Sequence, residues 1–363
     1  MKNLIIIFIC CTSIFACNSF KNESKDKVKT EDNIELNSGV SKFIYKDNKT
    51  LELNTIAFGS CNHQNDPQNY WQSITANRPD LWIWLGDNIY ADTQDMIAMK
   101  GMYDSLKMNH FYKEFYKNIP LIGVWDDHDY GTNDGDKNYP QKKVSRDLML
   151  EFLDVPKENP VWQREGAYSA YTFGTGEKKV KIILLDARYF RDTLEINDQG
   201  EDKYVKNETG DILGEAQWKW FENELNQSDA KLILIGCGIQ MLPEEQGFEK
   251  WGNFPKARKQ LLETLSASGN ENIILLSGDR HISEISKTEL EGIKNPVYEF
   301  TSSGLTHTWS EIWEEHNKYR VGELIINKSF GIIKINWEKE PLEVIFEMRD
   351  PENKLLQDLS IVL

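Results

Sequence analysis

The sequence contains few cysteines, and most of them lie at its beginning. Five of its 363 residues are cysteine, and Cys10, Cys11 and Cys17 all fall within the first seventeen positions. Only Cys61 and Cys237 remain for the rest of the chain, so a disulfide-rich scaffold is excluded. An exported protein could pair these two cysteines. Alternatively, Cys61 could be a thiolate ligand, which its polar neighbours favour.

Basic residues are outnumbered by acidic ones, 42 to 58. The formal net charge is −16, and the acidic residues are spread along the whole chain. Binding a polyanion over a broad surface requires a basic stripe, so no nucleic-acid-binding surface is expected. The chain contains neither a Gly-x-Ser-x-Gly elbow nor a Walker loop, which removes serine hydrolases and nucleotide kinases from consideration. A metal centre could still bind a single phosphate group.

No apolar run reaches the roughly 20 residues that a lasting transmembrane helix requires. A short apolar run, 4–11, follows Lys2, and the sequence then continues Ile14-Phe15-Ala16-Cys17. Residues 1–17 therefore resemble a bacterial lipoprotein signal, in which Cys17 becomes the lipidated N-terminus. The alternative is an ordinary secretory signal with an incidental cysteine. With lipidation at Cys17, we expect an exported protein in the periplasm or at the cell surface, anchored to a membrane.

Residues 18–45 are polar and show no helical or strand period, which predicts a disordered tether. Residues 46–363 are long enough, and rich enough in aromatic residues, to form one large core. Apolar strand-like runs alternate there with stretches of helical period, which predicts an α/β fold with much parallel sheet. The expected strands are Thr55–Gly59, Leu81–Leu85, Leu121–Val124, Lys179–Leu185, Lys231–Ile235, Asn272–Leu276, Pro296–Thr301, Phe330–Trp337 and Leu342–Met348, the last two as a hairpin. The expected helices are Pro67–Ala76, Gln141–Leu153, Glu215–Leu225 and Pro255–Ser266.

Four polar clusters follow four of the expected strands. They are Ser60-Cys61-Asn62-His63, Gly86-Asp87-Asn88-Ile89-Tyr90, Trp125-Asp126-Asp127-His128-Asp129 and Ser277-Gly278-Asp279-Arg280-His281. Open α/β folds bind their ligands at the carboxyl ends of the strands. Clusters of Asp, His, Cys and Tyr at these ends therefore indicate a metal site assembled from distant segments.

These motifs, together with Phe58-Gly59 before the first and Leu185-Asp186-Ala187-Arg188-Tyr189-Phe190-Arg191, resemble the PhoD-like branch of the metallophosphatases (alkaline phosphatase D). They occur in the family's order over most of residues 55–305. The resemblance implies a four-layer α/β-β/α sandwich of the metallophosphoesterase type. It also implies a multi-metal site containing ferric iron, Fe(3+), and calcium, Ca(2+), although other divalent metals would fit. Well-known members carry an N-terminal β-domain, so we expect a compact form without it.

The first metal is expected to be iron. Asp87 can bridge two cations with its two carboxylate oxygens, and Tyr90 would supply a phenolate that suits ferric iron. Cys61 would be a third iron ligand; the alternative is a small buried hydrophobic residue. For His63 we expect an exposed position or an indirect role behind the ligands.

The second metal is expected to be bound by harder ligands. Alignment on the family's Gly-Asn-His motif places Asp127 at the position of a metal-binding asparagine. Asp279 stands where the wider superfamily has a histidine, and this change to a carboxylate favours calcium or ferric iron over zinc. Asn133 has a counterpart in the family and an oxygen that suits calcium.

Three residues are expected to act on the substrate. His128 falls where an imidazole contacts the phosphoryl oxygen or protonates the leaving group. The guanidinium fork of Arg188 matches pairs of phosphate oxygens, and His281 completes the catalytic set. Asp129 would orient His128 or hold structure, and Arg191 is expected at the surface or in the scaffold.

Three further residues are placed less specifically. Gln240 could line the site, His307 could stand behind the ligands, and Asp186 is expected to anchor a turn.

From the motifs and the resemblance together we expect a metal-dependent phosphoesterase that hydrolyses phosphomonoesters, phosphodiesters or both through a metal-bound hydroxide. The alternatives are another metal-dependent ester hydrolase, or a lipoprotein-anchored binding protein with structural metals. The substrate, the oligomeric state and the metal stoichiometry stay open.

Overall fold

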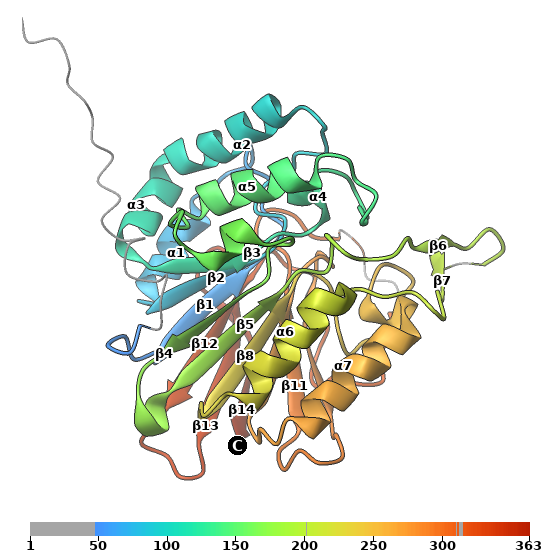
Figure 1. Ribbon diagram of the computed structural model, residues 1–363. Helices are drawn as coiled ribbons and strands as arrows, with labels where there is room; N and C mark the ends of the chain where they lie inside the picture. Colours follow the sequence, from blue (N-terminus) through green and yellow to red (C-terminus); the bar gives the residue numbers. More distant parts are fainter. Residues whose placement is uncertain (1–47, 201, 310, 312–314) are drawn as a thin grey trace, which may run out of the picture. The chain divides into compact units, whose positions relative to one another are not determined.

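Two mixed β-sheets face each other in the computed structural model, which describes residues 48–363 except 201, 310 and 312–314 (Figure 1). The described residues all belong to one unit, Ser38–Leu363. The expected signal peptide 1–17 with Cys17 and the expected tether 18–45 lie outside the described residues and stay predictions. Within the described residues, no helix combines the length and apolar character needed to cross a membrane.

The first sheet has the strand order β14-β13-β12-β1-β2-β3. Its strands are β1 Thr55–Gly59, β2 Leu81–Leu85, β3 Leu121–Val124, β12 Phe330–Asn336, β13 Glu343–Arg349 and β14 Leu355–Val362. β1, β2 and β3 run parallel, and the antiparallel strands β12 to β14 extend the sheet from β1. The predicted hairpin between β12 and β13 is therefore confirmed.

The second sheet has the order β10-β11-β9-β8-β5-β4. Its strands are β4 Ser169–Phe173, β5 Val180–Leu185, β8 Leu232–Cys237, β9 Ile273–Ser277, β10 Ser283–Thr288 and β11 Val297–Ser302. The four central strands run parallel, and β4 and β10 close the two edges in antiparallel pairing. Every residue of β5, β8 and β9 is buried, as their nearly continuous apolar sequences predict for parallel strands covered on both faces.

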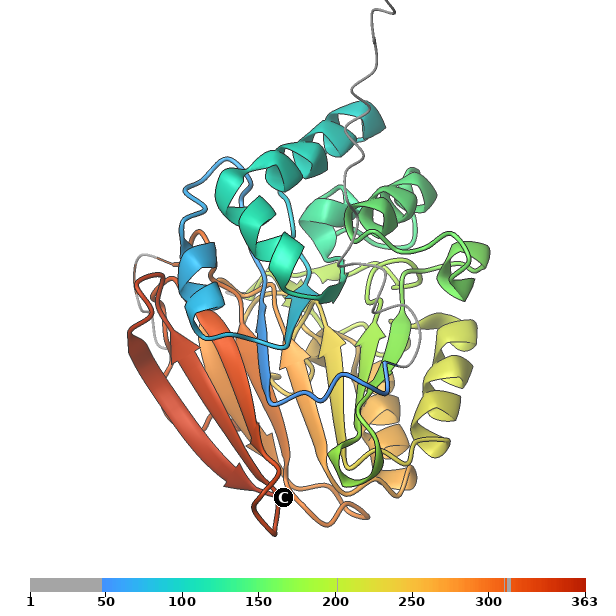
Figure 2. The ribbon, with the colours of Figure 1, turned by 90° about the vertical axis from the view of Figure 1, so that its left-hand side faces the viewer.

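Helices cover the outer face of each sheet, which gives four layers (Figures 1 and 2). The first sheet is covered by α1 Tyr70–Ala76, α2 Met96–Met108, α3 His110–Asn118 and α5 Lys142–Phe152, and the second by α6 Gly214–Asn226 and α7 Pro255–Ala267. The short elements are α4 Asp127–Tyr130, the 3₁₀ turns η2 Pro160–Gln163, η3 Gly176–Lys178 and η4 Trp251–Asn253, and the hairpin β6 Glu195–Ile196 and β7 Tyr204–Val205.

Aromatic side chains join the two sheets at their inner faces. Phe300 of β11 makes edge-to-face contacts with Phe58 of β1, at 4.9 Å between ring centroids, and with Phe346 of β13, at 5.2 Å. Such pairs add about 0.5–1.5 kcal/mol to the burial of the rings. The packing brings the carboxyl ends of the parallel strands of both sheets to the same end of the unit.

Candidate metal centre and catalytic site

The residues that follow the strand ends have unusual backbone conformations. Nine described non-glycine residues have positive φ, and six of them are Cys61, Asp87, Asp92, Asp134, Asp279 and His281. This left-handed region is uncommon for non-glycine residues and costs of order 1–3 kcal/mol when the residue is held there. Strain of this kind gathers at functional sites. Here Cys61, Asp87, Asp279 and His281 lie in the predicted motifs, and Asp92 and Asp134 lie a few residues beyond them.

The glycine of each Gly-Asp motif is required by close packing between the motifs. Gly86 has φ +91°, and a Cβ added there would lie 2.3 Å from the Cβ of Asp126. A Cβ on Gly278 would lie 2.5 Å from both the Leu85 carbonyl oxygen and the Ser60 hydroxyl. Only glycine lets these strand ends approach closely enough for their polar side chains to meet.

One set of ligand atoms combines sulfur, oxygen and nitrogen. The Cys61 thiol and the Tyr90 hydroxyl lie 3.4 Å and 3.3 Å from the same carboxylate oxygen of Asp87. The Tyr90 hydroxyl is also 3.0 Å from Nε2 of His281. The predicted iron ligands therefore converge, and His281, which was predicted to be catalytic, joins them.

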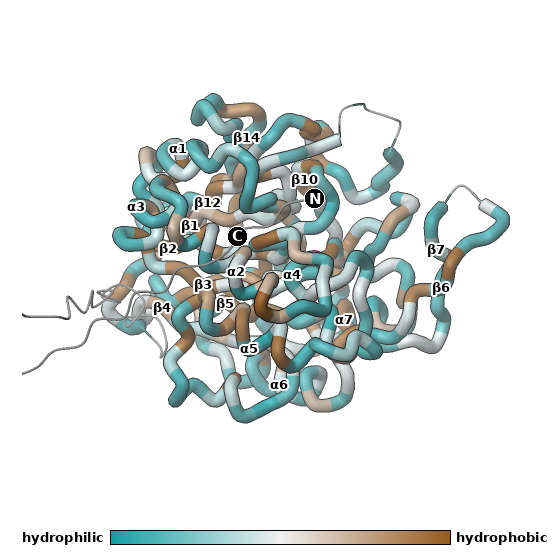
Figure 3. The backbone as a smooth tube through the Cα atoms, turned by 90° about the horizontal axis from the view of Figure 1, so that it is seen from above, coloured by the Kyte–Doolittle hydropathy of each residue, from teal (hydrophilic) through white to brown (hydrophobic). Residues whose placement is uncertain are grey.

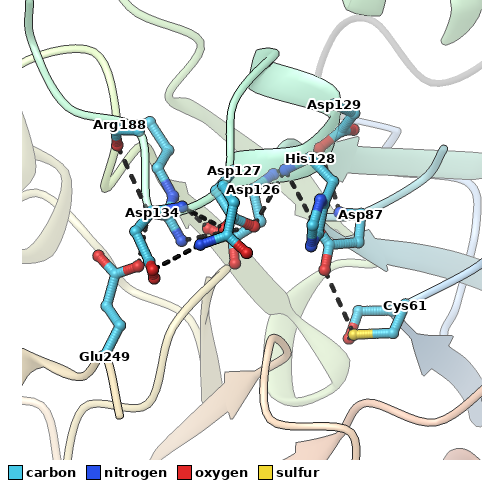
Figure 4. A network of polar contacts seen from close by, with 12 residues as sticks. Cys61, Asp87, Asp126, Asp127, His128, Asp129, Asp134, Arg188 and Glu249 are labelled. Carbon is cyan, nitrogen blue, oxygen red and sulfur yellow. Dashed lines mark hydrogen bonds and ion pairs between the residues drawn. The ribbon is translucent and has the colours of Figure 1, made fainter. Parts of the chain in front are cut away.

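A second set is made of carboxylates. Asp87, Asp127 and His128 form one group whose ligand atoms lie within 4.8 Å of one another, and Asp126, Asp127 and Asp279 form another. Figure 4 shows Asp126 and Asp127 side by side, with Asp87 turned toward His128. Burial and the neighbouring charge of Asp127 raise the pKa of Asp87 well above its ordinary value and that of Asp279 to about 7.

These residues fit metal cations. The buried carboxylates repel one another, and the second oxygen of Asp126 has no hydrogen-bond partner among the described atoms. A cation would relieve both, because it neutralises the carboxylates and accepts their lone pairs. Carboxylate oxygens suit hard cations, whereas thiolate, phenolate and imidazole together suit a transition metal.

His128 is held by Asp92 rather than by Asp129. Nδ1 of His128 lies 2.7 Å from the Asp92 carboxylate, so Nδ1 donates and Nε2 is left for other contacts. Burial alone would lower the pKa of His128, but the charges of Asp87 and Asp127 outweigh it and raise this pKa to about 10. Asp129 instead accepts backbone N–H groups of Asp126 and Asp87 at 2.7 and 3.1 Å. Of the two roles expected for Asp129, orienting His128 or holding structure, these contacts support the second.

Arg188 lies at the centre of a buried ion-pair network. It is fully buried, and it donates from Nε to Asp126 at 2.6 Å and from Nη1 to Glu249 at 2.7 Å. Its Nη2 lies 3.9 Å from Asp127 and makes no hydrogen bond among the described residues. Arg191 is not at the surface: it is also buried and pairs with Glu249 at 3.1 Å. Nη2 is itself fully buried, so the substrate contact expected of Arg188 stays a prediction.

The loop after α4 is tied to the β6–β7 hairpin. Asn133 is exposed, and its amide donates to the Asp134 carboxylate; its calcium role stays a prediction. The backbone N–H of Asp134 donates to Asp127 at 2.6 Å, and Lys203 and Tyr204 of the hairpin also bind the Asp134 carboxylate. Seen from above, the hairpin projects sideways from the unit (Figure 3).

The other predicted residues have structural contacts. His63 is half-buried, with its ring 5.6 Å from that of Tyr90. Asp186 anchors its turn as expected, because it accepts the backbone N–H of Arg188 at 2.9 Å. Gln240 is buried and donates to Glu284 and Thr301. Both Cys61 and Cys237 are free, so the alternative of a disulfide between them is wrong.

Sequence reasoning did not identify Glu249, Asp92 or Asp134 as parts of the site. Asp92 lies two residues after Tyr90, and this closeness to a predicted motif was the one available signal. Glu249 comes from a loop whose composition carries no periodic or motif signal. A cavity of about 660 Å³ beside α7 is lined by none of these residues, so the site is recognised by its chemistry and not by its volume.

A family model described as PhoD-like phosphatase matches residues 56–332 of this chain. The curated relative "Alkaline phosphatase D" of Bacillus subtilis is 21% identical over 302 residues, which cover 69% of this chain and 50% of the relative. The chain thus spans about half the length of the curated relative it matches.

Solved structures share the fold. A PhoD structure matches 86% of this chain and 69% of its own length, with TM-score 0.67 and 17% identity. A dimetal phosphatase from Danio rerio matches 86% of this chain and 99% of its own length, with TM-score 0.52 and 13% identity. GAP50, described as the anchor in the inner membrane complex of Plasmodium, matches 86% of this chain and 89% of its own length, with TM-score 0.55 and 11% identity. The predicted fold, a four-layer sandwich of the metallophosphoesterase type, is confirmed.

Proposed function

Because this chain belongs to the PhoD-like phosphatase family, we propose that it is an exported, metal-dependent phosphoesterase that hydrolyses phosphomonoesters, phosphodiesters or both. One observation carries the proposal: side chains that follow strands of both sheets bring their donor atoms together in two adjoining sets. Cys61, Asp87, Tyr90 and His281 form the first set, with successive separations of 3.0–3.4 Å. Asp87 also belongs to the second, with Asp127, which supports its role as the bridge.

The cations proposed for these sets are ferric iron and calcium. Bound there, they would lower the pKa of a water molecule and neutralise the phosphate charge. The residues of the chain perform the rest. Asp92 holds Nδ1 of His128, and the raised pKa of the ring keeps Nε2 protonated as well. Nε2 can therefore donate a proton or a hydrogen bond to the phosphoryl group or the leaving oxygen. Arg188 holds Asp126 in place beside the cluster. Its Nη2 is buried and has no hydrogen-bond partner among the described residues, so the guanidinium would have to shift before Nη2 met a phosphate oxygen.

Turnover of mono- and bis-nitrophenyl phosphate tests the proposal, with the metal content of the same sample measured by elemental analysis. Release of nitrophenol from either compound supports a phosphoesterase, and the ratio of the two rates reports the preference between monoester and diester. The fold alone does not decide between an enzyme and a binding protein, since the protein described as an anchor in Plasmodium has the same fold. A metal-replete sample without turnover would favour the binding protein instead.

The iron assignment predicts colour. Phenolate and thiolate donate electron density to ferric iron, so the purified protein should absorb visible light. We expect Tyr90→Phe and Cys61→Ser each to shift or bleach this absorption, because each removes one donor and keeps a similar shape. His63→Ala is the matched control and should leave the band in place. A colourless, fully active enzyme that contains only calcium, zinc or manganese would rule out iron but not the phosphoesterase.

The proposed location is a membrane surface, through a lipid on Cys17. We expect Cys17→Ser to abolish lipidation and to release active enzyme in soluble form, because the tether is expected to make no core contacts. Membrane fractionation and mass spectrometry of the N-terminal peptide measure this directly. A wild-type protein that fractionates as soluble and carries no lipid would contradict the anchor.

A further inference from the structure

A histidine outside the proposed ligand and catalytic sets lies against the same site. β11 runs parallel to β9, so its carboxyl end lies at the same edge of the sheet. The loop that follows it contains Thr306 and His307. The ring of His307 makes edge-to-face contacts with Tyr90, at 4.9 Å between centroids, and with His281, at 4.4 Å.

The hydroxyl of Thr306 has three partners. It accepts the backbone N–H of His63 at 2.8 Å, it donates to the carbonyl oxygen of Cys61 at 3.1 Å, and it lies 3.0 Å from Nδ1 of His307. A hydroxyl group has one proton to donate and two lone pairs to accept with. All three contacts are satisfied together only if Nδ1 of His307 carries the proton and donates it to Thr306.

This arrangement determines what His307 presents on its other side. With the proton on Nδ1, a neutral imidazole has a lone pair on Nε2. Nε2 makes no hydrogen bond within the described part of the chain, and it is not one of the fully buried polar atoms that lack a partner there. The half-buried ring therefore offers a hydrogen-bond acceptor beside Tyr90 and His281.

We propose that His307 is a further catalytic residue, whose Nε2 accepts a hydrogen bond from the water that attacks phosphorus and so directs the oxygen lone pair of that water toward the ester. The inference rests on the proposed phosphoesterase function. The oxygens of a phosphodiester or a phosphate dianion are acceptors themselves, so an acceptor is unsuited to bind them. The attacking water is the donor that every hydrolysis brings to the site.

The first test compares His307→Gln with His307→Phe. The glutamine oxygen can reach the place of Nε2 and accept a hydrogen bond, whereas phenylalanine keeps a ring but accepts none. We expect His307→Phe to lower kcat about 10- to 100-fold, as for a misplaced reacting group, with KM unchanged. His307→Gln should recover part of that loss. Equal activity of the two variants, or a change in KM alone, would overturn the proposal.

The second test uses the residue that holds His307. Thr306→Val removes the hydroxyl and should lower kcat as His307→Phe does, whereas Thr306→Ser keeps the hydroxyl and should recover most of that loss. Metal content and thermal unfolding are measured on all four variants. Loss of metal from His307→Phe at an unchanged unfolding temperature would make His307 a ligand and overturn the proposal. If the wild-type protein hydrolyses no phosphoester, the proposed function and this role of His307 both fail. If the wild-type protein and His307→Phe hydrolyse the phosphoester at equal rates, only the role of His307 fails.

Discussion

Asp87→Asn should lower kcat/KM for nitrophenyl phosphate at least about 100-fold, the loss typical of a major electrostatic element. Asp87 is the residue shared by the two ligand sets, since one of its oxygens faces Cys61 and Tyr90 and the other accepts the backbone N–H of His128 at 3.3 Å. Asparagine keeps the volume and an acceptor oxygen, but it removes the negative charge between the two proposed cations.

Folding should survive this substitution. Burial and the charge of Asp127 raise the pKa of Asp87, so ionisation of Asp87 costs stability as the pH rises when no cation is bound. A neutral asparagine does not carry that cost. The control is Asp104→Asn on the exposed face of α2, where the carboxylate pairs with Lys100. Turnover near the wild-type level in Asp87→Asn, with full metal content, would show that Asp87 is not the bridging ligand.

The strands that carry the site could be predicted from the sequence almost to the residue. Thr55–Gly59, Leu81–Leu85 and Leu121–Val124 are the observed β1, β2 and β3, because each is a short apolar run that ends at a polar motif. The strand predicted at Asn272–Leu276 is shifted by one residue, to Ile273–Ser277. A buried parallel strand is a nearly continuous apolar run, so the run gives the ends of the strand to within about a residue.

Elements without such a run were not predicted. β10 has the sequence Ser-Glu-Ile-Ser-Lys-Thr, and its pairing with β11 stabilises it rather than its own side chains. The apolar residues of β14 are interrupted by Gln357, Asp358 and Ser360, and most of the strand is at least partly exposed, since it forms the edge of the first sheet. The helices α2 and α3 were missed as well. α2 begins where the side chain of Asp95 accepts the backbone N–H groups of Ile97 and Ala98. This is a local cap, which an apolar period does not reveal.

The candidate site, too, could be predicted only in part from the sequence. Cys61, Asp87, Asp127 and Asp279 could be predicted to converge, because topology brings the residues after parallel strands to one edge. The hydrogen-bond or ion-pair partner of each charged group could not be predicted. Arg188 follows β5 as expected, but its pairing with Glu249 depends on the path of a loop that returns to the site sixty-one residues later. Sequence separation carries no information about such a contact.

The Arg188 network makes a strong prediction about stability. Arg188 and its partners Asp126 and Glu249 are each at most 1% exposed. In a buried network the attraction between the charges offsets the large cost of removing them from water. Removal of the guanidinium leaves two carboxylates without their partner, and Arg191 can compensate only Glu249.

Arg188→Met should therefore lower the free energy of unfolding by about 3–5 kcal/mol, the usual cost of breaking a buried pair from one side. Urea unfolding measures it. The double variant Arg188→Met/Asp126→Asn removes the charge left behind and should be more stable than the single variant, although it has lost one more native side chain. If Arg188 acted mainly on substrate, Arg188→Met would unfold at the wild-type urea concentration and lose only activity. A double variant less stable than Arg188→Met would likewise contradict the network, because the two losses would then add as independent sites do.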